Sequence, residues 1–239
     1  MSERPKTRAE RIEVVYNGDH WRLLNDLRSQ ALRIMNSLKA HEVESIIYGS
    51  IARGDVSPKS DIDIFIPNPP SSFLVEVALE RAGIPISQRV LIQATPSYVA
   101  KAYIEIDERR SVSFPLMRLR RVERGFYRFS GELPLQRLRS GERVCGVDKR
   151  LMLIEPTARG HVESGITGRE GYVAGLLGVD VEVVSDRVRT LLRRDEVGRT
   201  GVYLKRALSA CESFEAVLKE IIDRSPAMRR RIRTTERRV

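Results

Sequence analysis

The segment from Tyr48 to Asp63 carries the residues with the clearest capacity for chemistry. Gly49 and Ser50 follow a short apolar run, and Asp61 comes after ten intervening residues. A glycine lets the backbone approach an anion closely, and a serine adds a hydroxyl donor. Backbone amides at the start of a turn or helix suit phosphate oxygens. Gly49 and Ser50 are therefore candidates to bind a phosphate.

Two carboxylates, Asp61 and Asp63, alternate with isoleucines in a pattern that predicts a strand over 61–66. Residues two apart on a strand project from one face, so we expect these carboxylates to lie side by side. Like charges so placed repel unless a cation lies between them, and oxygen ligands suit Mg²⁺. Arg53 and Ser60, in the same segment, add a charge-assisted donor and a hydroxyl for a phosphate-bearing ligand.

The complete string resembles the signature of polymerase-β-like nucleotidyltransferases. It consists of Gly49-Ser50, then Ala52-Arg53-Gly54, then Ser60 before Asp61-x-Asp63. It is also similar to the minimal nucleotidyltransferase branch and to archaeal CCA-adding enzymes. The resemblance covers about 20–116 and stops there. CCA-adding enzymes have larger additional domains than this chain can hold, so no particular tRNA acceptor is implied.

The family requires a third carboxylate on a later strand. The segment Tyr103–Asp107 alternates, with Ile104 and Ile106 expected to face the core and Glu105 and Asp107 the site. The string is similar to the corresponding strand of archaeal CCA-adding enzymes, where the last acid of an acid-x-acid pair serves. Asp107 is therefore the first choice and Glu105 the alternative.

The resemblance implies nucleotidyl transfer with two Mg²⁺ ions about 3.5–4 Å apart. Asp61, Asp63 and Asp107 would act as the catalytic carboxylates and metal ligands. Gly49, Ser50, Arg53 and Ser60 would bind the nucleoside triphosphate, with ATP the first choice. In-line attack by a hydroxyl at the α-phosphorus would leave a nucleoside monophosphate on the acceptor and release pyrophosphate.

The elements that must position these residues follow from periodicity. We expect helices over 20–40, capped by Asp19, and 73–82, and strands over 44–48, 61–66, 90–93, 102–107 and 112–114. This order predicts an α/β (α+β) nucleotidyltransferase domain over 1–116, with a mixed sheet and flanking helices. Residues 1–17 are expected to be a lightly ordered lead-in.

The second half predicts two further parts. Residues 117–165 suggest a basic connector or a small β-rich subdomain, and 166–239 a mainly helical winged helix-turn-helix with a basic tail. A capping box of Thr167 and Glu170 would start the first helix, and Gly178 would end it. A hairpin over 196–204 and a helix over 207–222 would follow. The candidate contacts to nucleic acid are Arg187, Arg189, Arg193, Arg194 and Arg199.

Composition supports a polyanionic partner. Lys and Arg number 42 against 32 Asp and Glu, for a net charge of +10, which favours DNA or RNA. The two cysteines form no CxxC pattern, and His161 and Glu163 are expected to be a surface pair. No apolar run approaches the roughly 20 residues that cross a bilayer, so the sequence predicts a cytoplasmic protein without membrane contact.

Three functions remain open at this point. The first is transfer of a nucleotide to a nucleic acid, or to a molecule bound beside one. The second is transfer of AMP to a protein, as in the minimal nucleotidyltransferases. The third is a DNA-binding transcriptional regulator that senses nucleotides through its nucleotidyltransferase domain. A homodimer also remains open.

Overall fold

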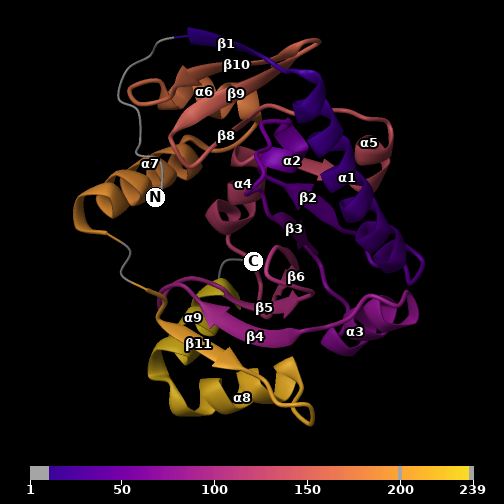
Figure 1. The fold of residues 1–239 in the computed structure, drawn as a ribbon. Coiled ribbons are helices and arrows are strands. Elements are labelled where there is room, and N and C mark those ends of the chain that lie inside the picture. The colour runs from indigo at the N-terminus through magenta and orange to yellow at the C-terminus, as the bar shows by residue number, and fades with distance from the viewer. Residues whose placement is uncertain (1–10, 199–200, 237–239) are drawn as a thin grey trace. The chain divides into compact units, whose positions relative to one another are not determined.

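The computed structural model describes residues 11–198 and 201–236, which form two compact units (Figure 1). The first unit takes in 1–32, 47–62 and 121–200 of the chain, and the second 33–46, 63–120 and 201–239. These units cut across the predicted boundaries at 116 and 165. None of the helices in the described ranges is both long and apolar enough to cross a membrane.

The first unit contains an antiparallel sheet in the order β1-β10-β9-β8. Its strands are β1 (Arg11–Val15), β8 (Gly146–Val147), β9 (Met152–Thr157) and β10 (Gly160–Gly165). The expected lead-in is therefore corrected, because residues 11–15 pair with β10. Gly160 permits this pairing, since a Cβ there would lie 1.9 Å from the Val14 carbonyl oxygen.

The first unit also contains helices. They are α1 (Gly18–Lys39, to Leu32 in this unit), α2 (Ser50–Arg53), α4 (Arg121–Phe129), α5 (Leu135–Arg139), α6 (Glu170–Leu177) and α7 (Val181–Val197). The strands β2 (Ile46–Tyr48) and β7 (Glu132–Pro134) are neighbours. A core of Leu153, Val173, Val184 and Leu191 joins the sheet to α6 and α7. Residues 117–165 thus hold two helices as well as strands.

The second unit holds strands in the order β11-β4-β5-β6-β3, flanked by helices. The strands are β3 (Ile62–Phe65), β4 (Gln88–Gln93), β5 (Ala100–Glu105), β6 (Arg110–Pro115) and β11 (Leu204–Ala207); the helices are α3 (Ser72–Arg81), α8 (Phe214–Arg224) and α9 (Pro226–Glu236). Burial alternates strictly along β5, as the sequence predicts. The α8 helix packs on the apolar face through Phe214, whose ring lies 5.7 Å from that of Phe114.

Helix starts differ in detail from the sequence prediction. At α1, the Asn17 side chain, rather than Asp19, accepts the His20 N–H at 2.9 Å. At α6, Gly168 has a φ of +80°, so the chain turns before the helix. Glu170 then folds back and accepts the Gly168 N–H at 3.0 Å. The expected capping box with Thr167 is therefore wrong.

The predicted winged helix is not confirmed, although its first two helices are present as α6 and α7. Gly178, at a φ of 62°, ends α6 and leads into α7, as expected for the helix pair. The predicted hairpin is wrong, because Glu196 and Val197 belong to the helix α7 rather than to a strand. Residues 204–207 pair with β4, and the predicted last helix starts only at Phe214, after a Ser213 cap.

Candidate functional site

The loop from Gly49 to Asp55, here called the motif loop, is built on glycine conformations. Gly49 has a φ of +83° and Gly54 a φ of +107°, which favour glycine at both ends of α2. The Gly49 N–H donates to the Gly131 carbonyl at 2.9 Å, which ties the loop to the residue before β7. The Gly54 N–H donates to the Ser50 carbonyl at 2.6 Å and closes the turn.

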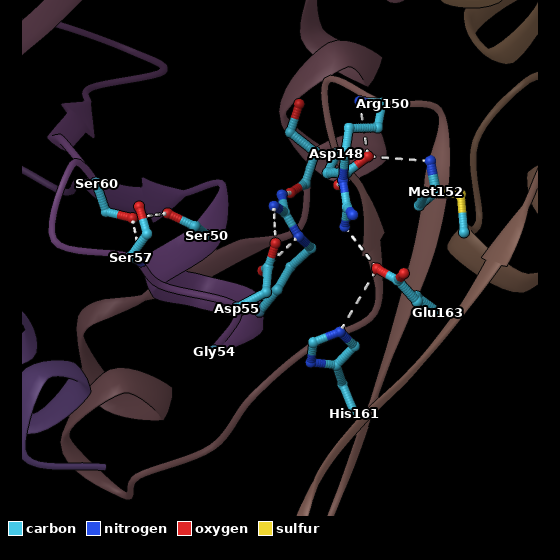
Figure 2. A network of polar contacts seen from close by, with 12 residues as sticks. Ser50, Gly54, Asp55, Ser57, Ser60, Asp148, Arg150, Met152, His161 and Glu163 are labelled. Atoms are coloured by element: carbon cyan, nitrogen blue, oxygen red, sulfur yellow. Dashed lines mark hydrogen bonds and ion pairs between the residues drawn. The ribbon is translucent and has the colours of Figure 1, made fainter. Parts of the chain in front are cut away.

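Two hydroxyls meet at the start of the motif loop. The Ser50 Oγ lies 3.2 Å from the Ser60 Oγ, which accepts the Ser57 N–H at 2.9 Å (Figure 2). The structure therefore brings together Gly49, Ser50 and Ser60 from the predicted set. Asp61 follows directly and is exposed.

Arg53 has a different environment from the one expected of a phosphate donor. It is buried, and its Nε and Nη2 donate to the two oxygens of Asp55 at 3.0 and 2.8 Å. Its Nη1 donates to the Ser130 carbonyl at 2.6 Å. Because these partners engage all three of its nitrogens, Arg53 holds the motif loop in shape rather than facing a ligand.

A buried polar network lies on β9 and β10 in the same unit. His161 and Glu163 are each 5% exposed, which corrects their assignment as a surface pair. Glu163 accepts from Arg150 at 2.5 Å and lies 3.9 Å from His161 Nε2 (Figure 2). The Tyr16 hydroxyl lies 2.7 Å from His161 Nδ1. Burial lowers the pKa of His161, so the ring is neutral near pH 7.

In the second unit, Asp63 lies on β3 and belongs to a polar row. Its Oδ1 accepts the Ser111 hydroxyl of β6 at 3.0 Å. Ser111 pairs with Glu105 of β5, and directly paired residues share a face. Asp63, Ser111 and Glu105 therefore line one face of three strands. Burial and the negative charge of Asp63 raise the pKa of Tyr103 to about 12.

Asp107 lies outside this row. It is exposed in the turn after β5, so the predicted strand ends two residues earlier than expected. Its Oδ1 accepts the N–H groups of Arg109 and Arg110 at 2.9 and 2.8 Å, and its Oδ2 the Arg110 Nε at 2.7 Å. The Arg110 side chain, with these backbone donors, holds the pKa of Asp107 below its usual value.

The candidate nucleic-acid contacts lie on or after α7. Arg189, Arg193 and Arg194 are exposed. Arg187 is partly buried, with its guanidinium 4.8 Å from the Phe126 ring centre, so it packs α7 against α4. Arg199 lies outside the described residues.

Comparison with known proteins bears on the segment that carries most of these residues. No curated protein and no solved structure matches the chain. Residues 28–119 match a family model described as the nucleotidyltransferase domain. This range includes the motif loop, Asp61, and the row of Asp63, Ser111 and Glu105 on β3, β6 and β5. The match supports the placement of residues 28–119 in the polymerase-β-like nucleotidyltransferase superfamily.

Proposed function

We infer that the protein is a Mg²⁺-dependent nucleotidyltransferase that moves a nucleoside monophosphate from a nucleoside triphosphate to a hydroxyl group. One observation carries this proposal: within the matched segment, Asp63 stands in a row with Ser111 and Glu105, two residues along the chain from the exposed Asp61. Such a set offers carboxylate oxygens and a positioning donor, which suits a hard cation and its phosphate ligands.

The donor set fits Mg²⁺ through two carboxylates, although the described residues contain no group of three His, Cys, Asp or Glu that could hold a metal ion by themselves. Mg²⁺ binds through one or two carboxylates and completes its shell with water and substrate phosphates. Asp61 and Asp63 would hold it. When bound, the metal supplies positive charge to the phosphates and lowers the pKa of the attacking hydroxyl.

The chain's own residues have distinct tasks in this proposal. Gly49 and Ser50 bind phosphate oxygens, and Ser60 positions the Ser50 side chain by accepting its hydroxyl hydrogen. Ser111 orients the Asp63 carboxylate through Oδ1. We assign the third carboxylate to Glu105 rather than Asp107, because Glu105 is paired with Ser111, which donates to Asp63, while Asp107 is bound to Arg110. Glu105 would accept the proton of the attacking hydroxyl.

Nucleic acid is the acceptor class that charge favours. The chain carries a net charge of +10, and three exposed arginines lie along α7. Phosphate contacts by such side chains would hold an acceptor strand without reading its sequence. Transfer of AMP to a protein, or nucleotide sensing by a DNA-binding regulator, are the alternatives that the experiment below separates.

The test uses each α-³²P-labelled nucleoside triphosphate with Mg²⁺ in a cell extract, with wild-type protein and an Asp61→Asn/Asp63→Asn variant. We expect label to enter nucleic acid with the wild type and not with the variant. Label in a protein band would show that the acceptor is a protein rather than a nucleic acid. Binding of triphosphate without any transfer would favour the nucleotide-sensing regulator.

A further inference from the structure

A buried arginine of α1 completes the backbone hydrogen bonds of the motif loop. Arg28 is 7% exposed. Its Nε and Nη2 donate to the Ile51 carbonyl at 3.2 and 3.1 Å, and Nη2 reaches the Ala52 carbonyl at 3.4 Å. A four-residue helix leaves its last carbonyls without intrahelical partners. Arg28 therefore satisfies the Ile51 carbonyl and adds a longer contact to the Ala52 carbonyl, which also accepts the Val144 N–H at 3.2 Å.

A second arginine, partly buried, supports the end of the same loop. Arg143 packs its stem against Gly54, where an added Cβ would lie 2.6 Å from the Arg143 Cδ. Its Nη1 donates to the Gly160 carbonyl at 2.8 Å, and Nη2 donates to the Thr157 carbonyl. The guanidinium lies 4.9 Å from the Trp21 ring centre, where the ring face stabilises a cation.

Arg28 and Arg143 differ from two other arginines of the same unit, because those two are neutralised by carboxylates. Arg53 and Arg150 each form ion pairs with carboxylates. Within the part of the chain that the structure describes, Arg28 and Arg143 donate to carbonyls and form no ion pair with a carboxylate. Burial, followed by the charge of Arg143, lowers the pKa of Arg28 to about 10, and no carboxylate opposes either effect.

A buried cation without a counter-charge is costly, and the cost falls when an anion binds nearby. The positive charge lies directly behind the loop to which the proposed function assigns phosphate binding. Dipoles of the carbonyls screen it only in part, since they carry no net charge. Its contribution to binding must therefore grow with the negative charge of the ligand.

We propose that Arg28 and Arg143 form a cationic support beneath the motif loop, which makes this site prefer a long phosphate chain over a short one. The support selects tripolyphosphate-bearing ligands over monophosphates before any contact to a base or sugar. This proposal rests on the proposed function, because it concerns the same phosphate site. Arg28 is a positioning residue, which acts through the loop and its field.

The experiment measures dissociation constants of the full chain for ATP, AMP and inorganic tripolyphosphate by calorimetry at fixed salt. Arg28→Gln keeps an amide donor for the carbonyls but removes the charge, whereas Arg28→Lys keeps the charge but loses the planar fork. We expect Arg28→Gln to raise the dissociation constants for ATP and tripolyphosphate about tenfold, and the constant for AMP much less. Arg28→Lys should stay within about threefold of the wild type.

The matched control is Arg33→Gln, an exposed arginine of the same helix, which makes the same change in net charge and should alter no constant more than about twofold. If Arg28→Gln does not fold, the same comparison is made with Arg143→Gln and Arg143→Lys. The arginines would only satisfy carbonyls if the Gln variant lost equal affinity for ATP and for AMP. The same conclusion would follow if the Lys variant bound ATP as weakly as the Gln variant. A wild type that binds neither ATP nor tripolyphosphate would overturn the proposed function as well.

Discussion

At the scale of single residues, the geometry around Asp63 decides which acid belongs to the site. The antiparallel register fixes Glu105 opposite Ser111, and Ser111 donates to Asp63. Asp107 is only two residues further along the chain, yet it lies beyond the strand and caps the turn to Arg110. The two acids therefore separate into one that faces the row and one that stabilises a turn.

This separation predicts opposite results for two isosteric substitutions. Glu105→Gln should lower kcat by at least about 100-fold, because it removes a base at the reacting centre. Asp107→Asn should leave kcat within about threefold and instead lower the melting temperature slightly, because an exposed turn contact is weak. Transfer rates and thermal melts of both variants provide the measurement. A large loss of kcat with Asp107→Asn alone would reverse the assignment.

The sequence predicted part of this residue-level detail. Gly49, Ser50, Asp61 and Asp63 are chosen as site candidates from their spacing, and their roles stay predictions. The choice between Glu105 and Asp107 depends on where β5 ends, which the Arg110 hydrogen bonds decide. The buried partners of Arg53 and His161 come from segments about 80 and 145 residues away, beyond any local pattern.

At the scale of elements, α3 and α8 are joined by two hydrogen bonds from Ser72 to Glu215. The carboxylate of Glu215, at the start of α8, accepts the Ser72 N–H at 2.8 Å and the Ser72 hydroxyl at 2.7 Å. The carboxylate thus sits at the start of α3, where the helix dipole favours negative charge. Burial raises the pKa of Glu215, but the Ser72 donors outweigh this effect and hold the pKa below its usual value.

The contact predicts a pH-dependent stability difference. A carboxyl whose pKa is depressed in the folded state stabilises the fold above its unfolded pKa and ceases to do so as pH falls through the folded value. Glu215→Gln should therefore lower the melting temperature at pH 7, and this difference should shrink as the pH falls through the folded-state pKa of Glu215. Melting curves of both proteins from pH 3 to 8 test this. A difference that is constant across the range would exclude a charge effect.

Helices and strands could be predicted from the sequence where buried apolar residues recur at regular spacing. The helix α1 and the strands β3 to β6 carry apolar residues at helical or alternating spacing. In contrast, β1 is exposed along most of its length, so its sequence shows no alternation of buried and exposed residues, and the residues of its partner β10 lie 145 to 153 positions away. The hairpin failed for the opposite reason: the local turn residues near Gly198 fitted a hairpin, but α7 extends through Val197 and 204–207 pair with β4.

At the scale of the whole molecule, excess positive charge is the feature that points to a partner. If the arginines of α7 contact phosphates, affinity for nucleic acid should fall steeply with salt. An Arg189→Gln/Arg193→Gln/Arg194→Gln variant should bind RNA or DNA less tightly and show a smaller slope of log K against log salt. The slope should decrease by about one for each phosphate that these side chains neutralise in the wild type.

The control for this variant substitutes Arg33, Arg81 and Lys219 by Gln, which removes the same charge from exposed positions elsewhere. It should keep most of the affinity and of the salt slope. Equal weakening by both triple variants would mean that net charge alone attracts the nucleic acid, and that α7 is no contact surface.

The central claim is that this chain transfers the α-phosphate portion of a nucleoside triphosphate with the help of Asp61 and Asp63. The most direct measurement incubates purified protein and Mg²⁺ with an acceptor RNA or DNA and with ATP labelled at either the α- or the γ-phosphate. We predict that α-label is retained in the acceptor, that γ-label appears in pyrophosphate, and that Asp63→Asn abolishes both. Retention of γ-label in the acceptor, or undiminished transfer by Asp63→Asn, would contradict the account.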